Sequence, residues 1–106
     1  MNSRQKGARG ERELSKVLRG YGFSARRGQQ YHGGAESPDV IGLKGIHIEC
    51  KRVERLNIDD AIAQSIRDAG DDMPVVIHRK NRKDWLVTMR LDDFMKLYGG
   101  FKNDSD

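Results

Sequence analysis

An aspartate and a glutamate on neighbouring apolar segments are the residues whose types and spacing best suit metal chemistry. Asp39 follows a proline at the start of one segment, and Glu49 lies inside the next, in Ile48-Glu49-Cys50-Lys51. Two carboxylates on adjacent strands offer the hard oxygen ligands that Mg²⁺ or Mn²⁺ prefers. Lys51 falls on the same strand face as Glu49, about 7 Å further along, where its ammonium can offset charge developing on phosphorus. The pattern predicts metal-assisted phosphodiester hydrolysis, although Glu-x-Lys alone also occurs by chance on exposed strands.

Two adjacent strands must position these carboxylates, and the sequence predicts both. Residues 39–43 form a strand opened by Pro38, where proline is tolerated, and Lys44-Gly45 reverses the chain. Residues 46–53 alternate strictly, with Ile46, Ile48 and Cys50 on one face and His47, Glu49 and Lys51 on the other. We expect Cys50 to be a buried structural thiol and His47 to be a surface histidine.

Hydrophobic periodicity predicts the elements around this hairpin. They are a helix over 10–21 with Glu11 leaning toward its buried stripe, a strand over 23–27, a loop over 28–37, a helix capped by Asn57 and running to Ala69, strands over 74–78 and 85–89, and a helix over 91–98. The order α-β-β-β-α-β-β-α predicts an α/β (α+β) fold in which helices flank a mixed sheet. Residues 1–100 are expected to form one domain, and 101–106 a disordered tail.

Charge is distributed unevenly along the 106 residues. Residues 1–56 carry twelve basic and six acidic side chains, whereas 57–106 carry eight and ten. The overall charge is +4 and the pI about 9.4, which favours a polyanionic partner or simply a soluble basic surface. One cysteine excludes an internal disulfide and a multi-cysteine zinc site. No apolar run approaches the roughly 20 residues of a membrane span, so we expect a cytoplasmic protein.

Four segments together resemble the PD-(D/E)xK nuclease superfamily and, within it, the archaeal-type Holliday-junction resolvases and their phage relatives. The segments are Lys6-Gly7-Ala8-Arg9-Gly10-Glu11-Arg12-Glu13-Leu14, Gly22-Phe23-Ser24-Ala25-Arg26-Arg27, Pro38-Asp39-Val40-Ile41 and Ile48-Glu49-Cys50-Lys51. The resemblance, over residues 4–90, implies a restriction-endonuclease-like fold. It also implies that Glu11, Asp39, Glu49 and the Cys50 backbone carbonyl bind the metal, that Lys51 serves catalysis, and that Gln64 helps to arrange the site. A solvated helix glutamine is the equal alternative for Gln64.

The resemblance and the basic surface together predict which residues contact DNA. They are Arg9, Arg12, Arg26, Arg27, Ser37, Arg52, Arg79, Lys80, Arg82 and Lys83. The segment 28–37 is longer than the archaeal pattern, and Ser37 is an imperfect match to its junction-contacting serine. The segment after Lys51 also departs from that pattern, which leaves the dimer interface open.

The sequence thus predicts a Mg²⁺-dependent, homodimeric endonuclease that cuts four-way DNA junctions, since two symmetric strands call for paired sites. Three alternatives stay open: another small nuclease of the superfamily acting on flaps, branched DNA or restriction sites; a noncatalytic DNA-binding module; and an RNA-processing nuclease.

Overall fold

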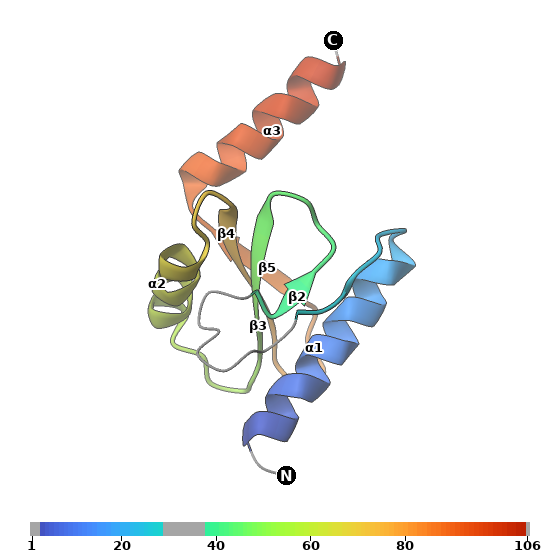
Figure 1. The fold of residues 1–106 in the computed structure, drawn as a ribbon. Helices are drawn as coiled ribbons and strands as arrows, with labels where there is room; N and C mark the ends of the chain where they lie inside the picture. Colours follow the sequence, from blue (N-terminus) through green and yellow to red (C-terminus); the bar gives the residue numbers. More distant parts are fainter. Residues whose placement is uncertain (1–2, 29–37, 106) are drawn as a thin grey trace.

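Five strands form a single sheet with three helices in the part of the chain that the computed structural model describes, residues 3–28 and 38–105 (Figure 1). In chain order the elements are α1 (Ser3–Gly20), β1 (Arg26–Arg27), β2 (Val40–Ile41), β3 (Ile46–Arg52), α2 (Ile58–Asp68), β4 (Met73–Arg79), β5 (Leu86–Met89) and α3 (Leu91–Ser105). This order and the mixed sheet confirm the predicted fold class.

The spatial order of the strands follows the chain, β1-β2-β3-β4-β5. The β1–β2, β2–β3 and β4–β5 pairs are antiparallel, whereas β3 and β4 are parallel. Parallel neighbours require a crossover connection, and α2 supplies it. Figure 1 shows α1 and α2 on opposite sides of the sheet, with α1 packed on β1 to β3 and α2 on β3 to β5. The central strand β3 is therefore covered on both faces.

The core lies mainly between α1 and the sheet. Its buried members are Leu14, Ala25, Val40, Ile48, Cys50, Val75 and Ile77. The layer between α2 and the sheet is thinner because the α2 residues that pack on the sheet are small. Ala61 and Ser65 are buried, and the Ser65 hydroxyl donates to the Val75 carbonyl oxygen at 3.1 Å. Small side chains let a helix axis lie close to the sheet, so residues beside them on α2 can reach β3.

Local signals explain where two of the elements end. The Asn57 side chain accepts the Asp60 N–H at 3.1 Å and caps α2, as predicted. The strand expected over 39–43 is shorter, because Gly42 has a φ of 125° and its backbone lies against Ala25. A Cβ at position 42 would stand 2.8 Å from the Ser24 carbonyl oxygen, so this approach requires glycine.

Both terminal helices are longer than their hydrophobic periodicity indicates. The α1 helix begins at Ser3 and not at residue 10, and α3 continues through the Gly99-Gly100 pair to Ser105, beyond the predicted end at residue 98. Figure 1 shows α3 extending away from the sheet. None of the helices within the described residues has the length and hydrophobicity needed to cross a membrane.

Candidate metal centre and active site

Asp39 is held at the start of β2 by hydrogen bonds to β3. Its N–H donates to the Ile48 carbonyl oxygen at 2.8 Å, and its Oδ2 accepts the Cys50 N–H at 2.8 Å. The antiparallel register pairs Val40 with Ile48, which sets the Asp39 side chain beside the middle of β3. The predicted hairpin therefore brings the carboxylates of positions 39 and 49 to one place.

Glu49 is the most deeply buried acid of the site, at 1% exposed. Its Oε1 lies 3.0 Å from His47 Nε2, and its Oε2 accepts the Gln64 amide N–H at 3.5 Å. Burial raises the pKa of Glu49, whereas the hydrogen bond with Asp39 and then the charge of Lys51 lower it. Burial, followed by the charge of Glu49, raises the pKa of Asp39 to about 7. The two acids thus share a site that disfavours two negative charges.

Lys51 and Gln64 complete the α2 side of the cluster. Lys51 Nζ donates to Gln64 Oε1 at 3.4 Å, while the amide nitrogen of the same Gln64 faces Glu49. Gln64 therefore contacts both the glutamate and the lysine of the Glu-x-Lys motif. Its role in arranging the predicted site stays a prediction.

Glu11 approaches the pair from α1, as its place on the buried stripe predicted. It is 8% exposed, and its Oε1 accepts a hydrogen bond from Arg27 Nε at 2.9 Å. Burial raises the pKa of Glu11; the Arg27 hydrogen bond lowers it, and the charge of Asp39 raises it further. The electrostatic coupling to Asp39 places Glu11 at the edge of the same acidic cluster.

The donor chemistry of this cluster fits a hard divalent cation. Glu11, Asp39 and Glu49 carry carboxylate oxygens, and burial raises the pKa of all three in the metal-free fold. A bound cation would lower these pKa values, because its positive charge would favour the ionised form of each neighbouring carboxyl group. The acidic pair with its flanking glutamate is therefore a possible metal site.

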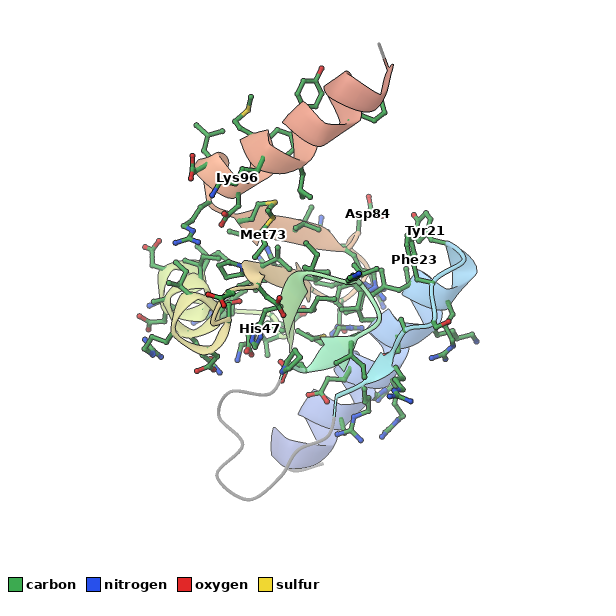
Figure 2. All side chains as sticks on the ribbon, turned by 45° about the horizontal axis from the view of Figure 1, so that its top comes forward. Tyr21, Phe23, His47, Met73, Asp84 and Lys96 are labelled. Atoms are coloured by element: carbon green, nitrogen blue, oxygen red, sulfur yellow. The ribbon has the colours of Figure 1, made fainter. Side chains whose placement is uncertain are left out.

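His47 lies beside Glu49 in an environment that the sequence did not predict. It was expected on the surface, but it is 3% exposed because α2 covers its face of β3. Figure 2 shows His47 on this side of the sheet. Burial lowers the pKa of His47, which favours a neutral imidazole. Strand alternation predicts the face of Glu49 for His47, but it does not indicate that α2 covers this face.

His47, Glu49 and Asp68 also bring potential ligand atoms within 4.8 Å of one another. This group differs from the predicted set of Glu11, Asp39 and Glu49, with which it shares only Glu49. Among the described residues, Glu11, Asp39 and Glu49 do not come this close to one another in the metal-free fold, so their role as a joint set of metal ligands stays a prediction.

The predicted DNA-contacting residues fall into two groups. Arg9, Arg12, Arg26, Lys80, Arg82 and Lys83 are exposed, whereas Arg27, Arg52 and Arg79 are partly buried in ion pairs. Both Arg52 and Arg79 donate to Glu13 Oε1, a partner that the sequence did not indicate. Arg52, Arg79 and Arg82 also line an open basic cavity of about 590 Å³. Ser37 lies outside the described residues.

Cys50 is buried, as predicted for a structural thiol. Burial raises the pKa of its thiol to about 12, so the sulfur is not a nucleophile near neutral pH.

The site has the parts that the sequence resemblance implied. Glu11 lies on a helix, Asp39 lies at the start of one strand, and the Glu-x-Lys motif lies on the neighbouring strand. The fold and the site therefore define a nuclease of the PD-(D/E)xK class. Residues 2–105 match the family described as "Phage putative PDDEXK endonuclease", and the chain belongs to this family.

A solved structure supports the same assignment. The chain is similar to Hjc, a Holliday junction resolvase from the archaeal hyperthermophile Archaeoglobus fulgidus, with 27% sequence identity and a TM-score of 0.58. The similarity covers 79% of this chain and 72% of the archaeal one. No curated protein matches the sequence.

Proposed function

We propose that this nuclease is a Mg²⁺-dependent endonuclease that hydrolyses phosphodiester bonds in branched DNA, with the four-way junction as its substrate. The observation that carries the proposal is the chain of contacts from Asp39 through Glu49 and Gln64 to Lys51. Two acids close to the Lys51 ammonium suit metal-assisted hydrolysis of a phosphodiester, which supports the proposal. The similarity to a resolvase supports the choice of junction DNA.

The metal would be held by Asp39, Glu49 and the Cys50 carbonyl oxygen, with Glu11 at its edge, and would supply an activated water and charge stabilisation at phosphorus. Mn²⁺ would substitute for Mg²⁺, as both prefer oxygen ligands. Gln64 orients the Glu49 carboxylate through its amide N–H, and its carbonyl oxygen holds Lys51 Nζ near the acids. Lys51 then offsets the negative charge that builds up on the phosphoryl oxygens.

The exposed arginines and lysines on α1, β1 and the β4–β5 turn would hold the phosphate backbone. The acids of the site would repel DNA without a cation, so the metal would also make binding at the site possible. We further propose that the protein acts as a homodimer in the cytoplasm of the host, because a four-way junction presents two symmetric strands.

A cleavage assay on end-labelled DNA tests the proposal. The substrates are a four-way junction, a flap and a linear duplex of matched sequence, with Mg²⁺ or EDTA, for the wild type and Asp39→Asn. We expect symmetric Mg²⁺-dependent cuts in the junction that the variant loses. Cleavage that is equal on all three substrates would refute junction selectivity but retain the nuclease. Junction binding without cutting at any Mg²⁺ or Mn²⁺ concentration would favour a noncatalytic binding module.

A further inference from the structure

The α3 helix carries large apolar side chains that are about half exposed or more. Six of its large apolar side chains are between 47% and 73% exposed: Leu91, Phe94, Met95, Leu97, Tyr98 and Phe101. The helix makes no extensive contact with any other described element, and Figures 1 and 2 show it standing away from the sheet. A contiguous apolar surface of this kind on a soluble protein marks a place where something else binds.

The spacing of these residues indicates a helix as the partner. Leu91, Phe94, Tyr98 and Phe101 recur at intervals of three, four and three residues, which is the a/d pattern of a two-helix seam. Phe94 stacks on Tyr98 with ring centroids 6.3 Å apart, and Tyr98 contacts Phe101 at 6.1 Å. The aromatic rings thus form one continuous row along α3, which we call the aromatic seam, comprising Leu91, Phe94, Tyr98 and Phe101.

The exposed area is sufficient for a specific interface between two copies. With about 200 Å² for a large apolar side chain, the six half-exposed residues present roughly 600 Å² per copy. Two copies would then bury about 1,200 Å², which is the lower bound of stable specific interfaces. The seam is also self-complementary, as a two-fold axis requires, because apolar rows need no opposite charge across the axis.

The charges of α3 argue against nucleic acid or membrane as the partner. Its described charged side chains are Asp92, Asp93 and Lys96, and Lys96 pairs with both acids. A helix that binds phosphates or an anionic lipid surface carries lysines and arginines on its polar face. A helix with an acidic first turn and an aromatic row fits a second copy of itself.

We propose that two copies of this chain associate through the aromatic seam of α3. The inference rests on the proposed function in one respect: pairing would supply the two active sites that a four-way junction needs. The aromatic seam would be the dimer interface, whose position the sequence left open.

Sedimentation velocity and light scattering on Phe94→Glu test the interface. The wild type is expected to be a dimer at micromolar concentration and the variant a monomer with unchanged helicity, because Phe94 makes its contacts outside the sheet. Lys96→Gln is the matched control: it changes the net charge by the same one unit on the opposite face of α3 and should remain dimeric. A wild-type monomer at all concentrations, or a Phe94→Glu variant that stays dimeric, would overturn the proposal.

Crosslinking gives a second measurement that does not depend on breaking the dimer. Tyr98 is the midpoint of α3, so two helices that cross at their centres place position 98 against its copy. Tyr98→Cys should be joined in high yield by a short bismaleimide, whereas the wild type, whose one cysteine is buried, should not. Absence of crosslinked dimer in Tyr98→Cys would contradict the central crossing.

A supercoiled plasmid with an extruded cruciform separates failure of the interface from failure of the proposed function. Paired cuts in one encounter produce linear DNA, whereas a single nick relaxes the plasmid and reabsorbs the cruciform. We expect linear product from the wild type and nicked circles from Phe94→Glu. No cleavage by a dimeric wild type would refute the nuclease activity and leave the interface standing. Linear product from a monomeric Phe94→Glu would refute the link between pairing and double cutting.

Discussion

Replacing Asp39 with asparagine should stabilise the metal-free protein at neutral pH while abolishing cleavage. In the fold, burial and the neighbouring Glu49 raise the pKa of Asp39 from 3.8 to about 7. The metal-free protein above pH 7 must therefore hold an ionised carboxylate beside a second acid. Asparagine has no charge, and its side-chain oxygen can still accept the Cys50 N–H. The variant keeps the hydrogen bond and loses the repulsion.

The sign and size of the effect follow from the two pKa values. Because the folded pKa exceeds the unfolded one, the carboxyl contributes its full stability below about pH 4 and loses it as the pH rises to 7. The free energy of unfolding changes by at most about 1.4 kcal/mol per pH unit for one proton, so the Asp39 carboxyl can change it by at most about 3 kcal/mol between pH 5 and pH 7. Asp39 is only partly buried, so solvent screening reduces the expected value to about 2 kcal/mol.

Urea unfolding in EDTA at pH 5 and pH 8, followed by the fluorescence of the single tryptophan, measures this difference. The free energy of unfolding of Asp39→Asn, minus that of the wild type, should be about 2 kcal/mol larger at pH 8 than at pH 5. Subtraction is needed because burial lowers the pKa values of His47 and His78, which oppose the carboxyl by losing stability as the pH falls. Asp84→Asn, at an exposed position, is the control. A variant-minus-wild-type difference that is the same at both pH values would refute the reasoning.

Substitutions at three further positions test individual roles in the candidate site and its surroundings. Lys51→Met should lower the cleavage rate at saturating Mg²⁺ by about 10²-fold or more with little change in junction affinity; an unchanged rate would remove Lys51 from catalysis. His47→Ala should raise the Mg²⁺ concentration for half-maximal cleavage by about 10–100-fold. His47→Gln keeps a donor toward Glu49 and should therefore need less Mg²⁺ than His47→Ala. If both variants need the same Mg²⁺ concentration, His47 acts through packing alone. Arg82 has a φ of 61°, so Arg82→Gly should raise the free energy of unfolding by about 1 kcal/mol. The same variant loses one positive charge and should reduce the salt dependence of DNA binding by about one phosphate contact. An unchanged salt dependence would exclude Arg82 from the DNA interface.

The sequence predicted the order of the elements and the pairing of Asp39 with Glu49, because both depend on short-range patterns. A proline before the first strand, a tight glycine turn and strict alternation in β3 fix the hairpin and its faces. The sequence could not show that both faces of β3 are covered, since that depends on where α2 returns across the sheet. His47 was placed on the correct face and in the wrong environment for this reason. The Glu13 ion pairs with Arg52 and Arg79 join three distant segments and leave no local signal.

The position of Gln64 shows how local and long-range determinants combine. The Asn57 cap fixes where α2 begins, and a shift of one residue would rotate the helix by about 100°, which would replace Gln64 with Ala63 or Ser65 at the site. The cap alone is not sufficient, because the amide must also reach β3. The buried Ala61 supplies that reach by letting α2 lie close to the sheet. A larger side chain at position 61 would push the helix outward and separate Gln64 from Glu49 and Lys51, even with the motif residues unchanged. The packing under α2 therefore helps to position Gln64 beside the acids of the candidate site.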